Sequence, residues 1–136
     1  MSSRDLVEAG WQKVRDDGRV GPELLEAAYA EPRLRRLFPW TGMGELHFSR
    51  CTGWPWTWDV PYIQPAADGG YWVSGPRRSE VVGPAATPQE AIAMVIERLP
   101  PNCGPAFVGT SAELEAHEAA ASSATAGPRN AERSAE

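Results

Sequence analysis

The chain has 136 residues, 42% of them hydrophobic and 23% charged, which indicates one globular domain with its own hydrophobic core. Its formal net charge of −5 argues against nucleic acid and against anionic membranes as main partners, because both attract basic proteins. The first residues are charged and are not followed by an apolar run, so we expect no signal peptide, no membrane-spanning segment and a cytoplasmic location. In that reducing compartment Cys51 and Cys103 are expected to be thiols.

The first third of the chain has the apolar spacing of helices. Residues 4–17 place their apolar side chains on one stripe, and Gly18 ends this predicted helix. A second helix is predicted over residues 22–30, with proline at its first position. Residues 33–38 predict one or two further helical turns that Pro39 ends.

The apolar period then changes to that of strands. Residues 45–51 alternate, with two apolar side chains on one face and Glu45, His47, Ser49 and Cys51 on the other. Further strands are predicted over residues 58–64, 71–75 and 80–83. Proline at position 61 makes the first of these an edge or bulged strand, with Trp58, Val60 and Tyr62 on one face.

The last predicted helix begins at Pro88, after the N-cap Thr87, and extends to about Leu99. A short strand over residues 106–108 and a weaker helix from Thr110 follow. The pattern predicts an α+β fold with N-terminal helices, then a three- or four-stranded antiparallel sheet covered by one long helix, in a two-layer sandwich.

The C-terminal end has a different composition from the rest of the chain. Residues 119–136 contain no aromatic residue and no Leu, Ile or Val, so they cannot bury enough apolar surface to order themselves. We therefore predict a single domain over residues 1–118 and a disordered tail over residues 119–136.

Three tryptophans alternate in a proline-stiffened segment, at Trp54, Trp56 and Trp58. Such a segment either braces the core or forms a recognition surface. A segment that prolines interrupt packs poorly, which favours a recognition surface over a core brace. Polar side chains lie next to these aromatic residues in the sequence, a combination that is usual in small-molecule pockets. The predicted ligand-binding residues are Trp54, Trp56, Trp58, Tyr62, Gln64 and Arg50.

Three side chains are candidates for catalysis: Cys51, His47 and Asp59. Cys51 and His47 share a strand face but lie about 13 Å apart along a regular strand, so a direct pair would require a bulge; the alternative is a half-buried thiol. Asp59 among aromatics could act as an acid or base, but the favoured interpretation is that it pairs with Arg50 or caps a backbone turn. No cofactor is expected and no metal, since no zinc-binding spacing is present.

A run of arginines, Arg33, Arg35 and Arg36, follows Pro32. Arginines beside a helix start could clamp a phosphate or carboxylate. The more usual interpretation is a solvated helix face.

Several separate motifs resemble a family from actinomycete genomes that is of unknown function and is usually labelled a natural product biosynthesis protein. They are Ser-Arg-Cys-Thr at 49–52, Trp-Asp-Val-Pro at 58–61, Val-Val-Gly at 81–83, Ala-Thr-x-x-Glu-Ala at 86–91 and Leu-Pro-Pro-x-Cys-Gly-Pro-Ala at 99–106. The resemblance implies a setting in secondary metabolism, but no reaction and no catalytic residue.

The leading hypothesis is an accessory protein that binds a small-molecule intermediate, or a partner biosynthetic enzyme, through the aromatic segment. One alternative is a small enzyme, a cyclase, isomerase or thiol-dependent transferase, that uses Cys51 or His47 and Asp59. Another is a regulatory or protein-interaction module. Substrate and oligomeric state do not follow from the sequence.

Overall fold

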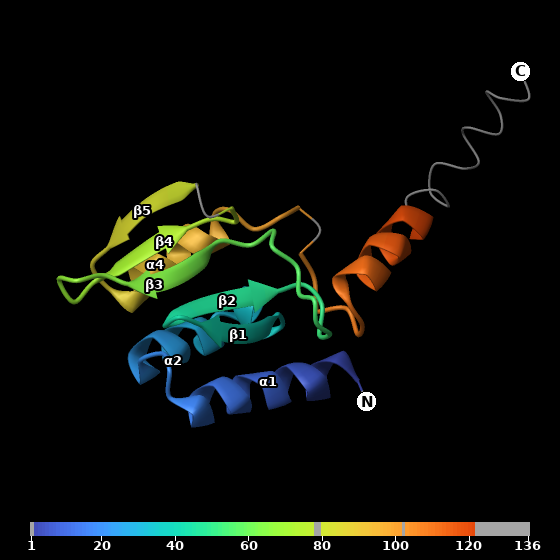
Figure 1. Cartoon of the computed structure of the whole chain (residues 1–136), viewed down its shortest axis with the longest axis horizontal. Coiled ribbons are helices and arrows are strands. Elements are labelled where there is room, and N and C mark those ends of the chain that lie inside the picture. Colours follow the sequence, from blue (N-terminus) through green and yellow to red (C-terminus); the bar gives the residue numbers. More distant parts are fainter. Residues whose placement is uncertain (1, 78–79, 102, 122–136) are drawn as a thin grey trace, which may run out of the picture.

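The computed structural model describes residues 2–77, 80–101 and 103–121 (Figure 1). Its elements are α1 (Ser3–Asp17), α2 (Pro22–Ala30), α3 (Pro32–Arg35), β1 (Phe38–Gly42), β2 (Glu45–Ser49), β3 (Tyr62–Pro65), β4 (Tyr71–Ser74), β5 (Val81–Ala85) and α4 (Pro88–Ile96). A further helix begins at residue 111 and is described to residue 121.

The predicted first helix is confirmed, and its ends have clear causes. The Ser2 side chain caps α1 by accepting a hydrogen bond from the Asp5 amide at 3.2 Å. Gly18 ends it in the left-handed region, with φ of 62°. Trp11 is completely buried on its apolar face, and its indole N–H donates to the Arg35 carbonyl at 2.9 Å. This bond ties α1 to α3.

Five antiparallel strands form one sheet in the order β1-β2-β3-β4-β5. The antiparallel α+β class was predicted correctly, but the strand count of three or four was wrong. The strand absent from the prediction is β1, because proline at position 39 predicts the end of a helical turn. Pro39 instead pairs with Phe48. Because β1 is an edge strand, it tolerates a residue that has no N–H.

One face of the sheet is covered by several helices, which corrects the prediction of one long covering helix. α1 packs against β1, while α4 packs against β4, β5 and α2. Nine residues make α4 about 13 Å long, and five strands span about 19 Å, so α4 cannot cover the sheet alone. In Figure 1, α4 lies behind β3 and β4. The core between these layers includes Trp11, Leu25, Leu46, Phe48, Ile63, Val73 and Val95.

The segment between β2 and β3 is irregular. We name residues 50–61 the tryptophan loop. A strand was predicted from residue 58, but β3 begins only at Tyr62. Val60 is buried in the core cluster, whereas Tyr62 lies on the opposite face of the sheet with the β2 residue His47. The predicted common face of Trp58, Val60 and Tyr62 is therefore wrong.

The C-terminal predictions are met in part. Phe107 forms a single parallel bridge with Cys51 rather than a strand. The helix from residue 111 is longer than the sequence suggested and includes residues 119–121, which were assigned to the tail. Residues 122–136 lie outside the described residues. Among the described residues, no helix combines the length and the apolar character that crossing a bilayer requires.

Candidate functional site

The sheet face opposite the helices carries buried polar side chains on β2. Glu45, His47 and Ser49 are 6%, 3% and 0% exposed, whereas Leu46 and Phe48 between them enter the core. The predicted alternation of β2 is thus confirmed, but both faces are covered. The tryptophan loop and neighbouring aromatic side chains cover the polar one.

Five aromatic rings form a continuous stack on this face. Trp40 lies 4.0 Å from His47 between ring centroids, and His47 lies 4.6 Å from Tyr62. On the other side of Trp40, Trp56 stacks at 4.8 Å and in turn lies 6.2 Å from Phe38. The stack follows from strand pairing, because Trp40 of β1 is directly opposite His47 of β2.

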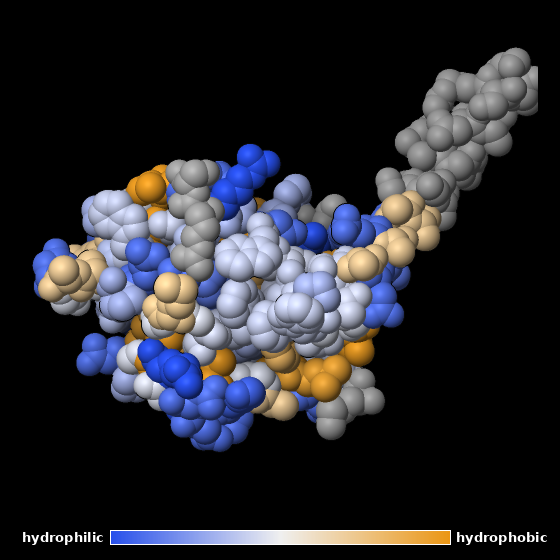
Figure 2. Space-filling view, in the orientation of Figure 1, coloured by the Kyte–Doolittle hydropathy of each residue, from blue (hydrophilic) through white to orange (hydrophobic). Residues whose placement is uncertain are grey.

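Trp58 closes this stack toward solvent. Its ring meets Trp40 at 5.5 Å, His47 at 5.1 Å and Tyr62 at 6.3 Å, each time in an edge-on geometry. Even so, Trp58 is 48% exposed, and Trp54 is 74% exposed. Figure 2 shows a pale zone of intermediate hydropathy over β2 and the tryptophan loop. The three alternating tryptophans therefore have three different environments.

His47 is paired with Glu45 inside the stack. Its Nε2 lies 2.9 Å from Glu45 Oε1, and both side chains are buried. An ionised carboxylate can only accept a hydrogen bond, so His47 then carries its hydrogen on Nε2. The pair combines a proton carrier with a group that orients it, but Trp40 and Tyr62 cover both faces of the imidazole.

The tryptophan loop is braced by hydroxyl groups. Ser49 Oγ accepts hydrogen bonds from the amides of Cys51 and Thr57, both at 3.1 Å. Thr57 Oγ1 accepts one from the Arg50 amide at 2.9 Å. These bonds hold the start of the loop against its middle, so its aromatic side chains are fixed relative to β2.

Cys51 is poorly placed to be a nucleophile. It is 0% exposed, and its Sγ lies 3.4 Å from both Ser49 Oγ and the Gly53 carbonyl oxygen. The described contacts of Cys51 do not include His47. Cys51 and Cys103 are both free and buried, and burial raises the pKa of the Cys103 thiol. The hydrogen-bond partners described for Cys51 Sγ belong to Ser49, Gly53 and Pro55, and none of them is a base.

Arg50 joins the tryptophan loop to the C-terminal helix. It binds Asp59 Oδ2 through Nε at 2.7 Å and Glu118 Oε2 through Nη1 at 2.7 Å. Burial disfavours its charge, but the hydrogen bonds to Glu118 and Asp59 outweigh burial and raise the pKa of Arg50. Of the two structural roles expected for Asp59, pairing with Arg50 is the one observed.

Gln64, another predicted ligand-binding residue, lies half-buried on β3, opposite Trp72.

A pocket of about 400 Å³ lies between the tryptophan loop and the C-terminal helix. Its lining comprises Arg50, Trp56, Thr57, Trp58, Asp59, Ser111, Leu114 and Glu115. Three of the six predicted ligand-binding residues, Arg50, Trp56 and Trp58, line this pocket. Tyr62 lies in the aromatic stack, and Trp54 is exposed and lies outside the lining. Among the described residues, no three His, Cys, Asp or Glu side chains are grouped so as to hold a metal ion.

Three contributors to the site were not predicted from the sequence. Trp40 and Phe38 alternate in β1, and that period of two was the available signal, but the proline between them obscured it. Glu118 was missed because it comes from a helix expected to be short and separate from the loop.

The chain belongs to a family of unknown function, DUF6193, whose model matches residues 5–110. The matched region contains the whole sheet and the tryptophan loop, and it ends before the C-terminal helix. No curated protein matches the chain, and no solved structure does either.

Proposed function

We propose that this chain is an accessory binding protein of secondary metabolism, which holds a small planar intermediate against the tryptophan loop. The observation that carries the proposal is the exposure of two large aromatic side chains, Trp54 at 74% and Trp58 at 48%, with Trp58 lining a pocket. Large exposed aromatic side chains beside a pocket are typical of recognition sites.

The surroundings of Trp58 favour binding over simple packing. Trp58 rests edge-on against the buried rings of Trp40 and Tyr62, and the loop below it is held by Ser49 and Thr57. A side chain held in this way loses little conformational freedom when a guest stacks on it, so more of the contact energy appears as affinity.

The charges around the pocket indicate which guest fits. Arg50 is already bound to Asp59 and Glu118, and Glu115 adds a further negative charge to the lining. A carboxylate or phosphate would be repelled there. The pocket therefore suits a planar molecule that carries no negative charge. The setting in secondary metabolism is supported by the motif resemblance, not by the pocket.

Binding of a neutral planar probe tests this proposal. In a ¹H–¹⁵N NMR titration with 2-naphthylmethanol, we expect the Trp58 indole signal and the amides of residues 56–59 to shift. Trp58→Ala should weaken binding about three- to tenfold, since one aromatic contact contributes about 0.5–1.5 kcal/mol. The matched control is Met43→Ser, which removes another exposed apolar side chain at the β1–β2 turn, outside the pocket lining.

Two results would count against the proposal. One is an unchanged Trp58 signal at millimolar probe. The other is equal weakening by both variants, which would indicate general apolar adsorption. Capture of a partner enzyme by the Trp54 surface, without any effect of the probe, would instead support the interaction-module alternative.

A second candidate function is a small enzyme that moves a proton through His47. The observation that favours it is the 2.9 Å contact between His47 and Glu45 inside an aromatic enclosure. Here Glu45 would be a positioning residue that orients the imidazole. Asp59 and Cys51 have no part in this candidate, because one is bound to Arg50 and the other is enclosed in the loop.

Histidine modification distinguishes the two candidates. With diethyl pyrocarbonate and peptide mapping, the binding proposal expects rapid modification of the exposed His117 and protection of the buried His47. Comparable rates at both histidines would show that the enclosure opens readily, which the enzyme candidate requires. Trp58→Ala should then raise the His47 rate further, while Met43→Ser should leave it unchanged.

A further inference from the structure

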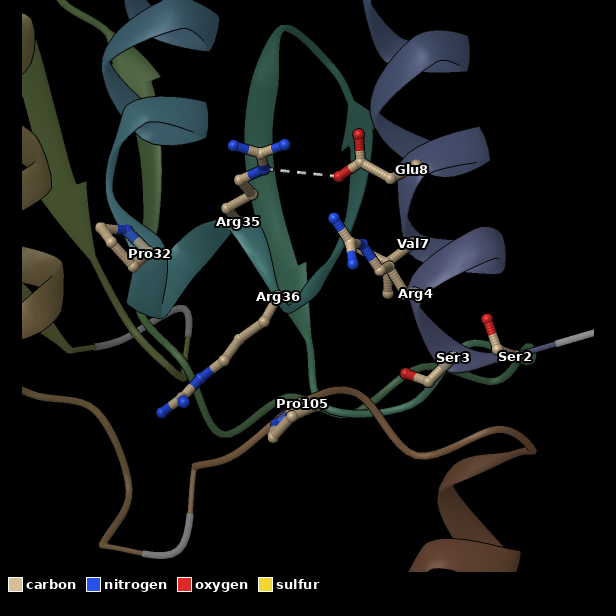
Figure 3. Close-up of a pocket in the computed structure, with 9 residues that line it drawn as sticks. All are labelled: Ser2, Ser3, Arg4, Val7, Glu8, Pro32, Arg35, Arg36 and Pro105. Atoms are coloured by element: carbon tan, nitrogen blue, oxygen red, sulfur yellow. Dashed lines mark ion pairs between the residues drawn. The ribbon is translucent and has the colours of Figure 1, made fainter.

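A second hollow lies on another part of the molecule, between the start of α1 and α3 (Figure 3). Its volume is about 540 Å³, within the range of pockets that hold small organic molecules. The lining residues are Ser2, Ser3, Arg4, Val7, Glu8, Pro32, Arg35, Arg36 and Pro105. We name this hollow the arginine groove. It shares no lining residue with the pocket at the tryptophan loop.

The arginine groove is positive in a protein of net charge −5. Three arginines line it against one carboxylate, Glu8. Glu8 is engaged already, because it lies 3.5 Å from Arg35 Nε and accepts a hydrogen bond from the Tyr29 hydroxyl. Arg36 donates to the Cys103 carbonyl at 2.7 Å, a neutral partner that leaves its charge uncompensated.

Arg4 is the distinctive residue of the groove. No hydrogen bond or ion pair joins its guanidinium to any of the residues 2–77, 80–101 and 103–121. Figure 3 shows it extending from α1 across the groove toward α3, below Glu8 and above Pro105. An unengaged guanidinium that points into a hollow is suited to bind a carboxylate or phosphate through two parallel N–H donors.

The remaining lining is apolar. Val7 is 2% exposed and belongs to the core cluster, so it forms a fixed floor. Pro32 and Pro105 lie on the other side of Arg4 and are rigid. A ligand that satisfies both parts of the lining has an anionic group and an apolar body.

We propose that the arginine groove binds a small organic acid, a carboxylate or phosphate ester on an apolar body. Arg4 contacts the anionic group, Arg35 and Arg36 supply the surrounding positive potential, and the apolar body packs on Val7, Pro32 and Pro105. The run of arginines after Pro32 then has a ligand-binding role, through Arg35 and Arg36, whereas Arg33 lies outside the lining. This site is independent of the function proposed for the tryptophan loop.

The test compares charged and neutral probes that share one apolar body. In ¹H–¹⁵N NMR titrations with 2-naphthoate, 2-naphthyl phosphate and 2-naphthylmethanol, we expect the two anions to shift amides of residues 3–8 and 32–36. Arg4→Gln should weaken anion binding about tenfold, as loss of a charge-assisted hydrogen bond predicts. Arg36→Gln should weaken it less, and whichever anion binds more tightly identifies the class of acid.

Arg33→Gln is the control, because it removes an arginine charge from α3, the helix that also carries Arg35, at a position outside the lining of the groove. It should leave anion affinity unchanged. The proposal is overturned if Arg4→Gln and Arg33→Gln weaken the anions equally, or if the neutral probe shifts the same amides with equal affinity. It is also overturned if Trp58→Ala, rather than Arg4→Gln, abolishes binding of the anions.

Discussion

Replacing Ser49 with alanine tests whether hydroxyl bracing holds the tryptophan loop in place. The Ser49 side chain is completely buried, and its oxygen accepts hydrogen bonds from the backbone amides of Cys51 and Thr57. Alanine keeps the volume close to that of serine but leaves both donors without an acceptor. The change should therefore affect hydrogen bonding far more than packing.

The expected loss of stability in Ser49→Ala follows from these two amides. An orphaned buried donor costs about 1–3 kcal/mol. Cys51 is fully buried, while Thr57 is partly exposed and can regain water, so the two together should destabilise the protein by about 2–4 kcal/mol. Ser74→Ala is the control, since Ser74 is a buried serine on β4 whose side chain has no hydrogen bond among the described residues.

Urea denaturation, followed by circular dichroism at neutral pH, measures the difference. Acrylamide quenching of tryptophan fluorescence adds a local readout, because a released loop exposes Trp56 as well as Trp58. The reasoning would be refuted if Ser49→Ala lost less than about 0.5 kcal/mol, or no more than Ser74→Ala, since changes of that size accompany ordinary surface substitutions.

Three further predictions concern stability and are all measured by urea denaturation. Gly10→Ala should cost about 1–3 kcal/mol, because the new Cβ would lie 2.8 Å from Phe38 Cε1, while Gly104→Ala meets nothing within 4 Å and should be neutral. Burial raises the pKa of Cys103 above its ordinary value of 9.0, so on raising the pH the thiolate forms first in the unfolded chain. The free energy of unfolding should therefore fall as the pH rises past 9.0. Cys103→Ala should make this fall shallower, and an unchanged slope would contradict the prediction. Arg50→Met should cost about 1–2 kcal/mol after allowance for solvent screening, and less in high salt; a salt-independent loss would point to packing instead.

Local signals in the sequence were sufficient for α1, α2 and the start of α4, and for the alternation of β2. Capping by Ser2 and Thr87, and termination by Gly18, act within a few residues and can be identified without the fold. The polar face of β2 was likewise correct, with Glu45 and His47 side by side.

Features that depend on long-range pairing were not predictable. β1 was not predicted, because proline at position 39 is compatible both with the end of a helix and with an edge strand. Only the order of strands in the sheet decides between these two structures. Without β1, the partner of His47 in the stack, Trp40, could not be identified. Val60 enters the core although Tyr62, two residues later, lies on the opposite face of the sheet. This placement depends on the path of the tryptophan loop, which the alternation of apolar residues in the sequence does not predict.

The contacts of the C-terminal helix bear on where this protein can be cut. The family match ends at residue 110, yet Ser111 donates to the Pro55 carbonyl and Glu118 completes the pairing of Arg50. A chain truncated at the limit of the match would lose one wall of the loop pocket and leave the arginine half-paired. The contacts that fix the tryptophan loop therefore extend beyond the region that the family match covers.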